Sequence, residues 1–454
     1  MLIQRINDIK TSKYLPFFVM GAIMLIFYIT ATDKFSDDIL YAISNPLQDG
    51  IAAMVIDIYH NWSARIFISP VMVALILSPI WLWRILDLAV WLILAVSISK
   101  LFAKDDNADT NWFIVALMML YPYWHMATAG WIATTTNFTW PLAAGMFILL
   151  TLKRTWEGVR LPAYRWILSG VAFLYATDAE QSLMILVIVF TALIAHQLYT
   201  KANNPQQYRI FLFTSFFLLI ARLIFTLTAP GNHVRRLSGH YTVPGFLEYS
   251  LGQQLTLSFE LTAMHYIHFT LALFPFFSLL LVLAVWGLHK SVLKRLISVV
   301  PFLISVILTC ITVVNALIFA RDNLTDYEGW FLDGFIMMSI PSWSGSNLLF
   351  IFFFMCLLYT LYLSQKNILD SCRVIGIMVI GFLSQLMLGI SPSLYGSALR
   401  TFVYTSFAII ICAVYVYENG ARAYLKKWMK VLLASICCIN FAITLVIGIV
   451  RMTA

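Results

Sequence analysis

The sequence has few charged residues: Asp, Glu, Lys and Arg together make up only 11% of its 454 residues. A soluble globular domain carries about 25%, so a soluble fold of this size is excluded. Hydrophobic residues make up 61% of the chain, and its mean hydropathy is +0.86. This composition predicts an all-α polytopic membrane protein without a sizeable soluble domain.

The absence of several sequence motifs excludes further classes of function. The six cysteines form no CxxC pair and have no metal-ligand spacing, which argues against a disulfide framework or a zinc site. No Gly-rich phosphate loop is present, so no cytoplasmic nucleotide site is expected. No basic stretch is interleaved with aromatic residues in a soluble context, and the net charge of +8 indicates basic cytoplasmic loops rather than a nucleic-acid partner. We predict no cofactor; one carboxylate pair is too little evidence for a divalent metal.

About thirteen apolar runs are long enough to be considered as membrane spans of roughly 30 Å. No repeat and no Pro/Gly/Ser linker divides them, so residues 1–454 are expected to form one integral-membrane domain. The basic N-terminus leads into the first run without a small-residue cleavage site, as in an uncleaved signal anchor. The expected spans lie near residues 14–32, 82–103, 111–127, 137–152, 163–177, 181–199, 209–228, 267–288, 294–318, 344–364, 372–390, 398–418 and 430–450.

One further apolar run, Ile66 to Trp81, is predicted not to span the membrane. Without it, loops on one face carry twenty of the 29 basic residues, and counting it as a span would destroy this asymmetry. Pro70 and Pro79 fit a helix that lies at the outer surface or is partly re-entrant. The N-terminus is then cytoplasmic and the C-terminus outside. The first outer loop covers 33–81, and further outer loops cover 229–266 and 319–343.

The first outer loop begins with an acidic pair, Asp37 and Asp38, directly after the first span. Ionisable groups close to hydrocarbon are costly and are often functional. A solvated turn that ends the helix is the alternative. Because other polar clusters are expected at the same face, the functional interpretation is favoured.

Several of these clusters could bind a ligand, and each also has a structural explanation. Arg65 could bind a phosphate or pair with an acid of the pair, or it could anchor the loop at the interface. The stretch with Asn137 and Trp140 could bind a sugar ring or form an aromatic belt. Asp178 and Glu180 lie in a tight turn, where they could hold sugar hydroxyls or cap the following helix.

The stretch from Pro230 to Arg236 is more distinctive, because a Pro-Gly-Asn turn containing Asn232 presents Arg235 and a second arginine at the end of a span. Guanidinium groups match phosphate oxygens in geometry. Arg400, after the Ser391-Pro392 turn, repeats this arrangement. The polar segment 319–343 is a candidate lid over an acceptor.

These motifs together resemble the GT-C class of multispanning glycosyltransferases, and most closely the bacterial phage-type serotype-converting O-antigen glucosyltransferases. The similarity covers most of the chain, although each motif is short. It departs at two positions, since relatives often have Gly where this chain has Ala64 and Asn where it has Asp178. The motifs that carry it are Ser36-Asp37-Asp38, Trp62-Ser63-Ala64-Arg65, Asn137 to Pro141, Glu180, Pro230-Gly231-Asn232 with Arg235, and Ser391-Pro392 with Arg400.

The resemblance implies inverting transfer of a sugar, glucose being the first candidate, from a polyprenyl-phosphate donor to an O-antigen-like acceptor. The reaction would take place on the periplasmic face of the bacterial cytoplasmic membrane. A separate donor synthase and a flippase would supply the donor. Asp37 would act as general base with Asp38 as its partner. Arg65, Arg235 and Arg400 would bind the donor phosphate, and Asn137, Trp140, Glu180 and Asn232 would contact sugar or acceptor.

Two other functions fit a polytopic chain with these residues. A transporter or flippase for a lipid-linked sugar would also gather arginines and aromatics, but transporters favour internal repeats and polar residues at mid-membrane. An O-antigen polymerase or ligase is the other alternative, and the acid pair directly after the first span argues against it.

Overall fold

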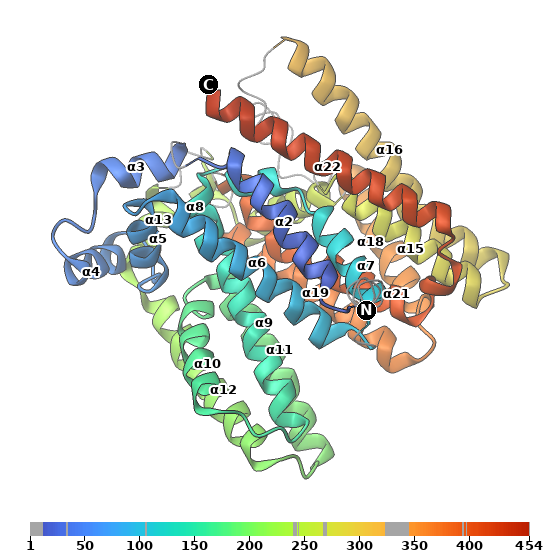
Figure 1. Cartoon of the computed structure of the whole chain (residues 1–454), viewed down its shortest axis with the longest axis horizontal. Coiled ribbons are helices and arrows are strands. Elements are labelled where there is room, and N and C mark those ends of the chain that lie inside the picture. The colour runs from blue at the N-terminus through green and yellow to red at the C-terminus, as the bar shows by residue number, and fades with distance from the viewer. Residues whose placement is uncertain are drawn as a thin grey trace, which may run out of the picture. The chain divides into compact units, whose positions relative to one another are not determined.

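The computed structural model describes residues 12–32, 35–104, 107–238, 243, 245–266, 270–322, 345–392, 395 and 397–453. All regular structure in these residues is helical, without a strand, which confirms the all-α prediction (Figure 1). The chain divides into two compact units. Unit 1 comprises 1–115, 123–238 and 445–454, and unit 2 comprises 116–122 and 239–444.

Unit 1 begins with one long apolar helix and a series of short ones. Pro79 directly precedes α6, and Pro205 directly precedes α12. At a helix start the backbone amide has no acceptor within the helix, so the amide hydrogen that proline lacks is not needed there. Its elements are α2 (Leu15–Thr30), α3 (Ser36–Ser44), α4 (Ile51–Asn61), α5 (Ile68–Ile76), α6 (Ile80–Phe102), α7 (Ala108–Met119, shared with unit 2), η1 (Tyr123–Ala127), α8 (Trp131–Thr134), η2 (Thr135–Thr139), α9 (Trp140–Trp156), α10 (Ala163–Ala176), α11 (Glu180–Thr200), α12 (Gln206–Thr228) and α13 (Pro230–Ser238).

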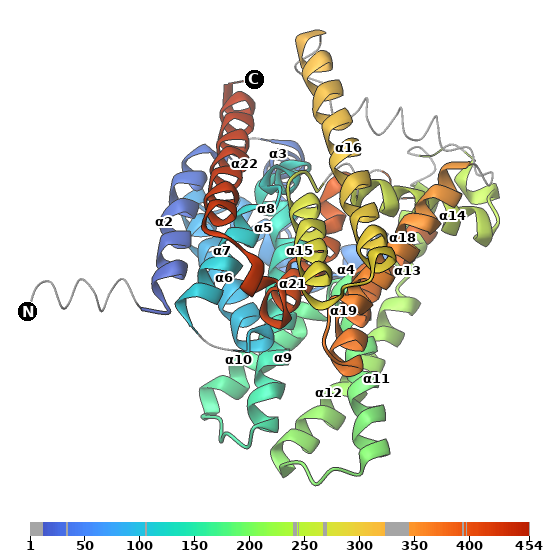
Figure 2. The ribbon, with the colours of Figure 1, turned by 90° about the vertical axis from the view of Figure 1, so that its right-hand side faces the viewer.

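Helices α9, α10, α11 and α12 pack together through a buried apolar cluster that includes Ile148, Phe173, Phe190 and Leu219. They extend side by side, away from the short helices α3, α4 and α5, in both ribbon views (Figures 1 and 2). The charged residues of unit 1 discussed below, such as Arg65, Glu180 and Arg222, lie where this bundle meets the short helices. The bundle therefore supplies a rigid base for the loop region of unit 1.

Unit 2 is built largely from long apolar helices. Helix α15 packs on α16 and α21, and α19 packs on α21 and α18 (Figure 2). Its elements are η4 (Phe246–Glu248), α14 (Leu251–Met264), α15 (Leu273–Leu288), α16 (Val292–Asp322), α18 (Gly345–Leu363), α19 (Ile368–Leu386), η6 (Met387–Ile390), η7 (Ala398–Phe402), α21 (Val403–Asn419), η8 (Ala421–Tyr424) and α22 (Lys427–Thr453, whose end from 445 belongs to unit 1).

Among the described residues, eight helices are long and apolar enough to cross a membrane, so the membrane assignment is supported but the count of thirteen spans is not confirmed. The remaining expected spans coincide with α2, α7, α10, α15 and α18. Four of these have 12 to 16 residues, fewer than the roughly 20 that a full crossing requires. Residues such as Pro122 and Pro162 limit their length, because a proline in a helix interior removes a hydrogen bond.

The segment 66–81 does not form a span, as predicted. Its helix α5 has nine residues, about 13 Å at 1.5 Å per residue, and Pro79 separates it from α6. Whether this segment lies at the outer surface stays a prediction. The segment 229–266, expected as a loop, is largely helical, with α13, η4 and α14. Of the expected lid 319–343, residues 323–343 lie outside the described residues.

Candidate functional site

Asp38 is fully buried and binds the start of a helix far along the chain. One carboxylate oxygen accepts the Ala133 amide at 2.8 Å, and the other accepts the Ile132 amide at 3.1 Å. Gly130 precedes this helix with φ of +90°, and a Cβ there would lie 2.5 Å from the Asp38 carboxylate. Asp38 is therefore a helix-capping acid whose two oxygens are already engaged.

Asp37 lies beside Asp38 in the first turn of α3 but is only partly buried. Helix α3 packs against α5 and α8, which brings the acid pair to the short-helix region of unit 1 (Figure 1). The preceding Ser36 has φ of +50°, an unusual conformation for a residue with a side chain. The two predicted acids thus have different environments, and Asp37 keeps partial access to solvent.

Asp178 plays the same capping role for a second short helix. One of its oxygens accepts the amides of Phe67 at 2.9 Å and Ile68 at 2.7 Å, at the start of α5. The sequence suggested that acids of this turn cap the following helix, α11; Asp178 caps α5 instead. Burial raises the pKa of Asp178 to about 6, although the charge of Arg222 acts in the opposite direction.

Arg222 also belongs to this group of charged residues, and the sequence analysis assigned it no role. Its guanidinium contacts the other oxygen of Asp178, and it donates to the carbonyl oxygens of Ala64 at 2.7 Å and Thr177 at 3.3 Å. It thereby ties the turn before α11 to the loop that carries Arg65. The available signal was an arginine in the apolar interior of a 23-residue helix, which is costly unless it has a partner.

Arg65, Glu180 and Arg235 form the centre of the polar cluster. Glu180 accepts from Nε of Arg65 at 2.9 Å and from its Nη2 at 2.6 Å, both on one oxygen. Its other oxygen accepts from Nη2 of Arg235 at 3.2 Å. The three side chains are 16–20% exposed. Two guanidinium groups thus converge on one carboxylate in a largely buried place.

Two asparagines complete the shell around the arginines. Asn137 accepts from Nη1 of Arg65 at 2.8 Å, and Asn232 lies 3.4 Å from Nη2 of Arg235. Asn137 sits in the π-helical turn η2, a local widening that often marks functional sites. Gly231 allows the start of α13 to lie close to the backbone at Trp62, because a Cβ at Gly231 would lie 2.5 Å from the amide nitrogen of Trp62. Four predicted residues therefore meet here: Arg65, Asn137, Glu180 and Arg235, with Asn232 beside them.

Trp140 takes part in a separate buried network. Its indole nitrogen donates to Asp87 at 2.6 Å, and the hydroxyl of Tyr28 donates to the other oxygen of Asp87 at 2.6 Å. Asp87 lies in α6 and is 1% exposed. Sequence reasoning missed it, because a single acid in an apolar span does not reveal its partners. The Trp140 nitrogen is thus engaged inside the protein, while the ring is half-buried against Tyr175.

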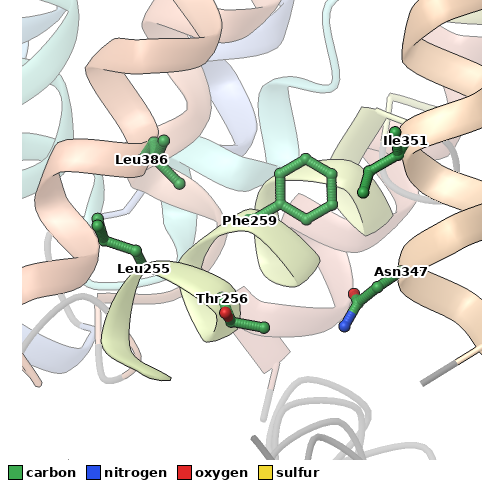
Figure 3. A pocket seen from close by; sticks show the side chains of 6 residues that line it. All are labelled: Leu255, Thr256, Phe259, Asn347, Ile351 and Leu386. Carbon is green, nitrogen blue, oxygen red and sulfur yellow. The ribbon is translucent and has the colours of Figure 1, made fainter. Parts of the chain in front are cut away.

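Arg400 is half-buried in η7 of unit 2, whereas the other candidate residues belong to unit 1. Unit 2 also contains a cavity of about 240 Å³ between α14, α18 and α19 (Figure 3). Its lining is mostly apolar, with Thr256 and Asn347 as the polar members: Leu255, Thr256, Phe259, Asn347, Ile351 and Leu386. This cavity contains none of the predicted site residues.

Among the described residues, no three His, Cys, Asp or Glu side chains lie close enough to hold a metal ion. Comparison with protein-family models, curated proteins and solved structures finds no match.

Proposed function

We propose that this chain is an inverting glycosyltransferase that uses a polyprenyl-phosphate-linked sugar, glucose being the first candidate, and an O-antigen-like acceptor. The observation that supports this most is the convergence of Arg65 and Arg235 on one carboxylate in a largely buried polar cluster. Such fixed cations suit the negative charge that develops on a leaving phosphate. The membrane setting suits a donor with a lipid tail.

Asp37 is the general base in this proposal. It takes the proton of the acceptor hydroxyl while that oxygen attacks the anomeric carbon. The bond between the anomeric carbon and the phosphate oxygen breaks, and its electron pair stays on the phosphate, next to Arg65 and Arg235. Asp38 is the poorer candidate because both of its oxygens accept backbone amides. It acts through α3, by holding the start of that helix against α8.

The contacts refine the other expected roles. Asn137 and Asn232 position the arginines. Glu180 balances their charge, and Trp140 offers one ring face for a sugar while its nitrogen is held by Asp87. The role of Arg400 as a phosphate ligand stays a prediction. The proposal places the site on the periplasmic side of the bacterial cytoplasmic membrane, with a synthase and a flippase supplying the donor.

The decisive experiment uses purified protein in detergent with a lipid-linked glycan acceptor. One reaction receives polyprenyl-phosphate glucose and the other receives a nucleotide sugar alone. We expect product only from the lipid-linked donor. Product from the nucleotide sugar would refute the assignment, and transbilayer movement of the donor without product would favour a flippase. Mass spectrometry of surface polysaccharide from cells with and without the gene would then identify the sugar.

The orientation has its own test. A cysteine at Ser36 should react with an impermeant thiol reagent in cells whose outer membrane has been permeabilised. A cysteine at Lys201, on the face expected to be cytoplasmic, should react only after lysis. A background without the six native cysteines keeps the two signals separate. The reverse pattern would overturn the periplasmic location of the site.

A further inference from the structure

Glu180 holds the two arginines in the way that a phosphate would. Each of its oxygens faces one guanidinium group, at 2.6 and 2.9 Å from Arg65 and at 3.2 Å from Arg235. Carboxylates and phosphates both present paired oxygens that fit the guanidinium fork. A phosphate that bound here would therefore need the donors that Glu180 already uses.

The pairing of Arg235 with Glu180 leaves a donor unused. Nε of Arg235 is buried and has no hydrogen-bond partner in the described structure. An unpaired buried donor destabilises the folded protein, so a ligand oxygen that accepted a hydrogen bond from Nε would be favoured at this position. Burial lowers the pKa of Arg235, and the nearby Glu180 charge counteracts this effect. The cluster thus has a spare donor on Arg235.

We propose that Glu180 is a built-in competitor that occupies Arg65 and Arg235 until a phosphate group displaces its carboxylate. The ligand class is a phosphate carried on a hydrocarbon chain, and only this choice of ligand rests on the proposed function. In this arrangement the arginines are kept ordered and partly neutralised while the site is empty. Phosphate binding is weaker as a result, because the arrangement that can bind phosphate is populated only when the Glu180 carboxylate has moved away from the arginines.

The structure provides a place for the displaced carboxylate. Glu180 is the first residue of α11, and its carboxylate already accepts a hydrogen bond from its own backbone amide, so the side chain can turn further toward this helix start, where a negative charge is stabilised. Its neighbour Asp178 is held separately by Arg222, Phe67 and Ile68. The backbone of the turn can stay in place while the Glu180 side chain moves.

Binding to the detergent-solubilised full-length protein tests this competition without any need for sugar transfer. The probes are farnesyl phosphate, inorganic phosphate and farnesol, measured by isothermal titration calorimetry. Glu180→Gln should bind both phosphate probes about tenfold more tightly than the unmodified protein, as expected if the released state is populated at about 10%. Farnesol binding should not change. Glu157→Gln, at an exposed pair with Arg154, is the matched control and should behave like the unmodified protein.

If Glu180 only positions the arginines, its removal should weaken phosphate binding, and that result would overturn the proposal. Equal binding, or an equal gain for farnesol, would overturn it as well. If Glu180→Gln does not fold, Glu180→Asp can be used instead. This variant should bind phosphate more tightly if Glu180 competes with the ligand, and more weakly if Glu180 only positions the arginines. A protein that shows competition but transfers no sugar would refute the proposed function and leave this inference intact.

Discussion

The two units of the molecule hold their segments together by different means. In unit 1, distant segments are joined through charged groups: Arg65 with Glu180, Arg222 with Asp178, and Asp38 with the start of α8. In unit 2, the polar contacts between distant segments include neutral pairs, such as Asn419 with Gln365 at 2.6 Å and Gln385 with Thr401 at 2.8 Å.

This difference bears on the proposed function. Charged groups near a membrane are expensive to bury, whereas neutral hydrogen bonds can fix helices at lower cost. Unit 2 joins several of its helices through apolar packing and amide or hydroxyl contacts, although it also buries the charged residue Glu260. We infer that the charges of unit 1 serve a ligand as well as stability, and the following variants test this inference.

The largest effect is expected from Arg222→Met. The variant leaves the buried Asp178 without its counter-charge and removes donors from Ala64 and Thr177. Loss of one partner of a buried pair costs about 3–5 kcal/mol. Unfolding in mixed micelles would measure the loss, with Arg373→Met as control, since that exposed pair with Asp370 should contribute less than about 1 kcal/mol. Equal effects of the two variants would remove the contrast between the units.

The pH dependence of Arg222→Met has a defined sign. Burial already raises the pKa of Asp178 to about 6, above its value in the unfolded chain, and removal of Arg222 raises it further. A carboxyl group whose folded pKa is raised takes up its proton more readily when folded, so stability is lost as pH rises through that pKa. The destabilisation should therefore be smaller at pH 5 than at pH 8. Further replacement with Asp178→Asn should abolish this pH dependence.

Asp37→Asn is expected to reduce sugar transfer by roughly 10²-fold or more, because the amide cannot accept the acceptor proton. The free energy of unfolding should change little, since Asp37 is only partly buried. Asp49→Asn, on the same loop and exposed, is the matched control for loss of a negative charge. Normal transfer by the Asp37 variant, measured with the lipid-linked donor, would place the base elsewhere.

A smaller effect, on stability rather than chemistry, is expected from Asp38→Asn. The amide keeps one oxygen for the start of α8 but loses the second acceptor and the negative charge. Charge-assisted hydrogen bonds of this kind contribute about 1.5–3 kcal/mol, and the variant should lose part of this. Thermal unfolding should show the loss. A variant that unfolds like the original protein but transfers no sugar would reassign Asp38 to the chemistry.

The smallest effect is expected in unit 2, from the double variant Asn419→Leu with Gln365→Met. Replacement of both partners of a buried neutral hydrogen bond by apolar groups of similar size can be nearly neutral. We expect a change within about 1 kcal/mol in the free energy of unfolding. A loss as large as that of Arg222→Met would show that neutral contacts carry unit 2 as strongly as charged contacts carry unit 1.

The sequence alone determined the helical membrane class, because composition and long apolar runs report burial in lipid without any partner. It also singled out Asp37, Asp38, Arg65, Glu180 and Arg235, since ionised residues at the ends of apolar runs stand out against their surroundings. It further identified 66–81 as an element that does not span, through the charge asymmetry of the loops.

Only the tertiary structure decided which of these residues meet and what they do. Asp38 and Asp178 cap α8 and α5, which begin 93 and 110 residues away from them respectively (131 − 38 and 178 − 68). Arg222 and Asp87 have hydrogen-bond partners that no local sequence pattern predicts. Periodicity and propensity describe neighbours within a few residues, whereas a buried charge takes whichever counter-charge or amide the packing of distant helices brings within about 3 Å.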